Sequence, residues 1–69
     1  MTLEEYFRAT RAIHEELAQI ATRTAAMAGV SSADTTNPEF AGLMSRHSGL
    51  VAQFREAHAR FIAENPQYA

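Results

Sequence analysis

Residues 2–28 read TLEEYFRATRAIHEELAQIATRTAAMA and indicate the fold most clearly. Apolar and near-apolar side chains recur there at intervals of three and four residues, at Leu3, Tyr6, Thr10, Ile13, Leu17, Ile20, Thr24 and Met27. This spacing follows one face of an α-helix and excludes a strand, whose side chains alternate every second residue. Thr2 and Glu5 form a capping box, in which each side chain binds a free backbone N–H of the first turn. The stretch therefore predicts one long helix over residues 2–28.

A second helix is predicted over residues 38–64. Its apolar seam is Phe40, Leu43, His47, Leu50, Phe54, Ala57 and Phe61. Asn37 suits the N-cap and Pro38 the first helical position, whereas Asn65 before Pro66 disfavours further helix. Residues 29–37 are mostly small and polar and predict a loop, with Gly29 suited to ending the first helix. Residues 65–69 are expected to form a short tail.

Two helices of equal length joined by a short loop predict an all-α fold, an antiparallel two-helix hairpin that makes residues 1–69 a single domain. Folding the chain about its loop pairs residues whose numbers sum to about 67. This register predicts four contacts across the seam: Tyr6 with Phe61, Ile13 with Phe54, Ile20 with His47, and Met27 with Phe40.

The hairpin is not expected to stand alone. A chain of 69 residues without cysteine has no disulfide to stabilise it, so packing or association must do so. A second stripe lies beside the seam of the second helix, and its apolar members have no evident place in a two-helix contact. The stripe is Met44, Ser48, Val51, Arg55, His58 and Ile62. We therefore expect oligomerisation or a partner protein to complete a four-helix bundle or a larger helical assembly.

Two glycines lie seven residues apart inside the second helix, at Gly42 and Gly49. A glycine in a helix interior costs roughly 1 kcal/mol relative to alanine. One interpretation is that they let another backbone approach closely, in which case Gly49→Leu should abolish assembly and preserve the helices. The other is that this face is simply small, as expected of an alanine-rich chain. The candidate interaction surface is Gly42, Met44, Gly49, Val51, His58 and Ile62.

His47 occupies a seam position between Leu43 and Leu50. A polar residue at such a position can fix the register or the oligomeric state. Because histidine titrates near neutrality, we also consider His47 a possible pH-sensitive position for association. The alternative is a partly buried histidine that a neighbour or water satisfies.

The sequence predicts no enzyme and no cofactor. It contains neither Glu-x-x-His nor His-x-x-x-His, the helical spacings that bind metals, and no glycine-rich phosphate loop. It also lacks a run of about 18 apolar residues, so we expect no membrane partner. The acidic start at Glu4 and Glu5 is unlike a secretory signal and predicts a cytoplasmic protein.

The function predicted from these features is a non-catalytic protein–protein interaction or structural module, acting as a homodimer or as a small subunit of a larger complex. A phage-encoded virion part or inhibitor is one setting for such a chain. One alternative is a nucleic-acid-associated regulatory dimer with an arginine ridge at Arg11, Arg55 and Arg60. The net charge of −2 and the expected ion pairs Glu4–Arg8 and Glu56–Arg60 argue against it. Another is an accessory subunit of an enzyme complex.

Overall fold

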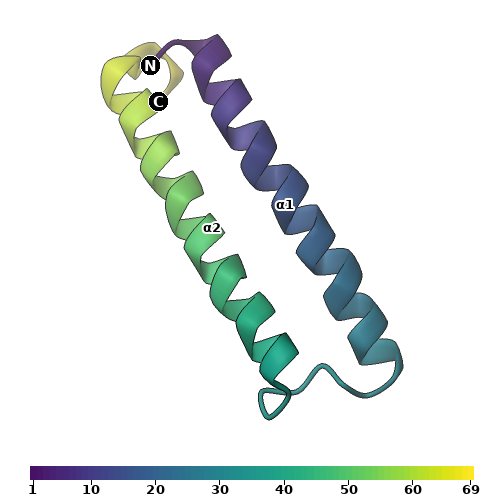
Figure 1. Ribbon diagram of the computed structural model, residues 1–69. Helices are drawn as coiled ribbons and strands as arrows, with labels where there is room; N and C mark the ends of the chain where they lie inside the picture. Colours follow the sequence, from purple (N-terminus) through teal and green to yellow (C-terminus); the bar gives the residue numbers. More distant parts are fainter.

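The computed structural model describes residues 1–69 as two antiparallel helices, α1 (Leu3–Gly29) and α2 (Pro38–Glu64), followed by the 3₁₀ turn η1 (Pro66–Tyr68). The molecule is a rod of 46 × 16 × 15 Å, with both chain ends at one end and the connecting loop at the other (Figure 1). The expected all-helical hairpin is confirmed, and its helices begin and end within one residue of the predicted bounds.

Both helices begin with the predicted caps. The Glu5 N–H donates to Thr2 Oγ1 at 3.1 Å, and the Thr2 N–H donates to Glu5 Oε1 at 2.9 Å. The Thr2 N–H holds the pKa of Glu5 below its ordinary value, because it stabilises the charged carboxylate. At α2, Asn37 Oδ1 accepts a hydrogen bond from the Glu39 N–H at 3.0 Å, and Pro38 is the first helical residue. These side chains satisfy backbone donors that a helix otherwise leaves free.

The end of α1 differs from the sequence expectation. Gly29 is the last helical residue, and the left-handed conformation falls on Ser31, with φ 59°. The Ser32 N–H donates to the Met27 carbonyl at 2.8 Å, and the Ser31 N–H donates to the Ala28 carbonyl at 3.1 Å. This is the Schellman pattern, which needs a positive φ two residues beyond the last helical residue. The helix runs one residue further than predicted, so a serine takes the position that glycine usually fills.

Ser31→Gly is expected to stabilise the hairpin by about 0.5–1 kcal/mol. A side chain in the left-handed region costs roughly 1–2 kcal/mol, and the greater freedom of glycine in the unfolded chain offsets part of that gain. The measurement is the thermal unfolding midpoint by circular dichroism, which should rise by about 4 °C. The matched control is Val30→Gly, because Val30 is exposed and has φ −116°. This control should lower the midpoint, and a drop in both variants would contradict the prediction.

The core is small and lies along the line where the helices meet. Ile13 and Ile20 of α1 pack with Leu50 of α2, and four partly buried apolar side chains flank them. These four are Leu17, Leu43, Met44 and Phe54. Thr10 is buried as well, and its hydroxyl donates to the Tyr6 carbonyl at 2.9 Å, so the polar group is satisfied inside the helix.

The predicted contact of Tyr6 with Phe61 is confirmed, whereas that of Ile20 with His47 is wrong. The rings of Tyr6 and Phe61 stack with centroids 4.5 Å apart, as the pairing predicted. His47 is exposed, however, and Leu50 is the α2 residue that packs with Ile13 and Ile20. Leu50 is buried in the seam as predicted, whereas a straight helix of 3.6 residues per turn drifts from a strict heptad seam and leaves the His47 imidazole in water.

The C-terminal tail folds back against the hairpin. Asn65 Nδ2 donates to the carbonyls of Met1 at 2.8 Å and of Phe61 at 3.0 Å, and Glu64 forms an ion pair with the Met1 amino group. The Tyr68 ring stacks on Phe61 with centroids 5.4 Å apart. Two tyrosines therefore contact the ring of one buried phenylalanine, and of these contacts the sequence predicted that of Tyr6 but not that of Tyr68. The signal was the i, i+7 spacing of Phe61 and Tyr68, which Pro66 interrupts.

Candidate interaction surface

One side of the seam is charged. Arg23 pairs with Glu39 at 2.7 Å, and Arg46 pairs with Glu16 at 2.6 Å, so both ion pairs connect α1 to α2. The Arg23 guanidinium holds the pKa of Glu39 below its ordinary value by a direct hydrogen bond. These side chains are about half exposed, so the pairs orient the helices more than they stabilise them.

The other side of the seam is apolar and carries all three histidines of the chain. The His14 ring meets the Phe54 ring edge-on, with centroids 5.3 Å apart, and the Phe54 ring stacks near His58. At about 100° per residue, His14 lies about 160° around α1 from Glu16, which places the charged and apolar rows on opposite sides. We call this side the apolar face. It consists of Phe7, His14, Met44, His47, Val51, Phe54, His58 and Ile62.

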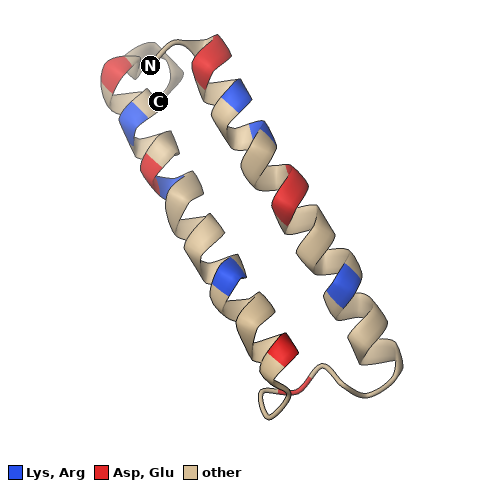
Figure 2. Cartoon of the chain, in the orientation of Figure 1, with Lys and Arg blue, Asp and Glu red and all other residues tan.

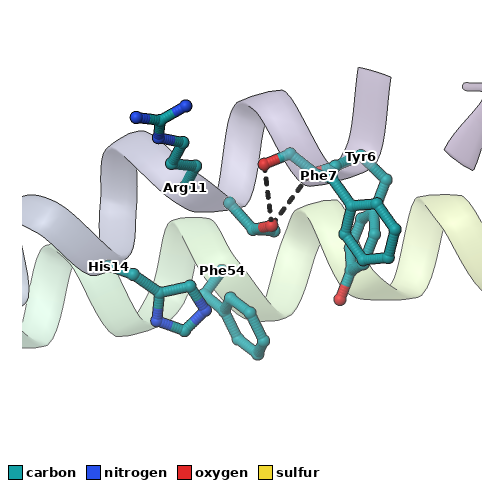
Figure 3. A pocket seen from close by; sticks show the side chains of 6 residues that line it. Tyr6, Phe7, Arg11, His14 and Phe54 are labelled. Carbon is teal, nitrogen blue, oxygen red and sulfur yellow. Dashed lines mark hydrogen bonds between the residues drawn. The ribbon is translucent and has the colours of Figure 1, made fainter. Parts of the chain in front are cut away.

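The half of the apolar face nearer the two chain ends, which we call the open end of the hairpin, contains a hollow of about 410 Å³. It is lined by Tyr6, Phe7, Thr10, Arg11, His14 and Phe54. The His14 and Phe54 rings lie side by side across the two helices at its edge (Figure 3). Phe7 is 58% exposed, although it is one of the largest apolar side chains in the protein. Exposure of the Phe7 ring to water is unfavourable, so this hollow is a candidate contact region.

A second hollow of about 330 Å³ lies along α2, lined by His47, Ser48, Val51, Ala52 and Arg55. The predicted register position His47 therefore lies in an open groove. Its role as a pH-sensitive position for association stays a prediction. Neither hollow has an acidic residue in its lining.

His58 is held by the opposite helix, because its Nδ1 hydrogen-bonds with the Tyr6 hydroxyl at 3.0 Å. The Tyr6 ring also stacks on Phe61, so one side chain connects the buried stack to the apolar face. This contact fixes the orientation of an exposed imidazole.

The structure divides the predicted interaction surface into two parts. Met44, Val51, His58 and Ile62 belong to the apolar face. Gly42 and Gly49 point away from it, since Gly49 and Val51 lie about 160° apart around α2. No atom lies within 4 Å of where a Cβ would stand on either glycine, so nothing in the hairpin requires glycine at these positions.

Met44 corrects the sequence reading in one respect. It was expected to have no place in the two-helix contact, yet it packs partly buried against the core cluster of Ile13, Ile20 and Leu50. The flexible thioether reaches inward from the edge of the seam, which a branched side chain at the same position does less well.

The arginines do not form one ridge. Arg11 pairs with Glu15 at 3.0 Å and Arg60 pairs with Glu64 at 3.4 Å, so the expected Glu56–Arg60 pair is wrong, whereas Glu4–Arg8 forms at 2.9 Å. Arg60 meets Glu64 because the latter lies one turn ahead and is held at the open end by Met1. Arg55 and Arg60 lie about 140° apart around α2. Acidic and basic positions are mixed along both helices, without a block of one sign (Figure 2).

No three histidine, cysteine, aspartate or glutamate side chains lie together in a way that could hold a metal ion. Neither helix is long and apolar enough to cross a membrane. The surface feature that stands out is the apolar face with its two hollows.

Comparison with protein-family models, with curated proteins and with solved structures finds no match to this chain.

Proposed function

We propose that this protein is a non-catalytic interaction module that associates through the apolar face of its helical hairpin. The observation that carries the proposal is the placement of large apolar and aromatic side chains outside the core. Only 6 of the 69 residues are buried, whereas Phe7 is mainly exposed and Val51, Phe54 and Ile62 are only partly covered. An apolar face of this kind, beside a charged one, is typical of an interaction site.

The shape of the molecule supports the same proposal. Its accessible surface is 4852 Å², against about 4,300 Å² for a compact monomer of the same mass. Its radius of gyration is 15.2 Å, against about 11 Å for a compact chain of this length. Two helices alone form a thin rod with one line of contact, so much of each helix stays uncovered. Packing a further helical layer on the apolar face would cover it.

The test is the solution mass by light scattering across a wide range of protein concentrations, together with thermal unfolding at each concentration. We expect a mass above the 7.6 kDa of one chain and an unfolding midpoint that rises with concentration, because association stabilises the folded state. A monomer that unfolds cooperatively at a constant midpoint would contradict the proposal, since the hairpin would then need no partner.

A further inference from the structure

The rod is large enough to form a stable dimer on one of its long sides. In outline, a side of 46 × 16 Å measures on the order of 700 Å². Two copies meeting on this side would bury about 1,500 Å², within the range of about 1,600 ± 400 Å² for stable protein–protein interfaces. A small peptide would leave most of the face exposed, and a second hairpin would cover its whole length.

The side chains along the α1 edge of the apolar face become smaller from the chain ends toward the loop. Phe7, His14, Ala21 and Ala28 are spaced by seven residues and follow one line along α1. The first two are large and lie at the open end, whereas the two alanines lie toward the loop and are exposed. On this face α1 therefore presents large side chains in the half near the chain ends and small side chains in the half near the loop.

We propose that the apolar face is covered by a second copy of this chain running antiparallel, with the two-fold axis crossing α1 between Leu17 and Ala18. This inference rests on the proposed function and adds its occupant and geometry. In this arrangement Phe7 lies against the second copy's Ala28, and His14 lies against the second copy's Ala21. The half of each α1 with large side chains meets the half of the other α1 with small side chains, so the distance between the two helices stays even.

The same axis fits α2. The stack of Tyr6 on Phe61 sets the register of the hairpin, which puts the axis level with Gly49 and Leu50. Met44 of one copy then lies opposite Arg55 of the other, at the second hollow of about 330 Å³. The part of Met44 that its own core leaves uncovered can then pack against the aliphatic stem of that arginine.

The charges are compatible with this packing. The two ion pairs between the helices, Arg23–Glu39 and Arg46–Glu16, lie on the side turned away from the second copy. The two Arg55 side chains would be about 16 Å apart along the rod and the two Arg11 side chains about 20 Å apart, from the helical rise. Both separations exceed the Debye length of about 8 Å at physiological salt, so repulsion between copies is screened.

The opposite arrangement, with both loops at the same end, is less favourable. It would place Phe7 of one copy beside His58 and Ile62 of the other and His14 beside Phe54, and the alanines would face the loop half. The large side chains near the chain ends of the two copies would meet each other. They would hold the two hairpins apart and leave a gap between them near the loops. Close packing along the whole face favours the antiparallel form.

A single cysteine tests the geometry, because the chain contains none. In the proposed dimer the two Ala18 residues lie beside the axis, where the small side chains of Ala18 and Ala21 let the helices approach to about 8 Å. Oxidised Ala18→Cys should therefore become a disulfide-linked dimer with unchanged helix content, since a disulfide requires Cα atoms within about 7 Å. Ala25→Cys is the control on the same face, because its two copies would be about 22 Å apart and should stay unlinked.

Mass and cross-linking together separate the two proposals. A dimer by light scattering in which Ala18→Cys does not link would overturn the antiparallel geometry and leave the interaction module in place. Equal linking at Ala18 and Ala25 would also overturn the geometry, since no single axis satisfies both. A chain that is monomeric at all concentrations would overturn both the module and the dimer.

Discussion

Phe61→Ala is expected to unfold the hairpin at room temperature. Phe61 is 3% exposed and contacts the rings of both Tyr6 and Tyr68, so its removal leaves a cavity at the open end. Truncating a buried phenylalanine to alanine typically costs about 3–5 kcal/mol. A core of this size supplies only about 3–5 kcal/mol in total. One substitution therefore removes most of the stability that the chain has.

Circular dichroism at the helical minimum measures the result, and the expected signal is that of a largely unfolded chain. Tyr68→Ala should cost less, about 1 kcal/mol, because Tyr68 is 52% exposed and provides only one stacking contact. Gln53→Ala, at an exposed position of α2, serves as the control and should change stability by less than about 0.5 kcal/mol. Retention of the full helical signal in Phe61→Ala would show that the open-end stack does not hold the helices together.

Val51→Lys is expected to leave the hairpin folded and to prevent its association. Val51 is only partly buried in the single chain and lines the second hollow at the centre of the proposed interface. An unpaired charge enclosed there would cost roughly 3–5 kcal/mol. This loss corresponds to a rise in the dissociation constant of at least about 100-fold. Lysine is preferable to glutamate, because Arg55 lies one turn away and would neutralise an introduced carboxylate.

Light scattering at a concentration where the natural chain associates gives the comparison. Gln53→Lys adds the same charge on the other side of α2 and should associate normally. Gly49→Leu decides between the two faces: the apolar-face proposal predicts normal association, whereas close contact at Gly42 and Gly49 predicts its loss with helices intact. A normal dimer in Val51→Lys would exclude the apolar face as the interface.

Local sequence was sufficient wherever the deciding contacts lie within one or two turns. The capping box of Thr2 and Glu5, the cap at Asn37 and the stop before Pro66 each depend on neighbours along the chain, so the helix bounds were predictable. The pairing of Tyr6 with Phe61 was predictable as well, because two equal helices and a short loop leave little choice of register.

Patterns along the chain thus predict two helices, their ends, their antiparallel pairing and the sides that meet, since all six buried residues belong to the two predicted seams. The packing of the two helices determines which residues at the edge of each seam are covered, because a small rotation about the helix axis exchanges them. That rotation exposes His47 and brings Met44 inward. It also gathers the histidines opposite the ion pairs and gives the rod separate apolar and charged sides. The α2 part of the apolar face was already indicated by the second stripe, but the addition of Phe7 and His14 from α1 depends on the joint packing of both helices.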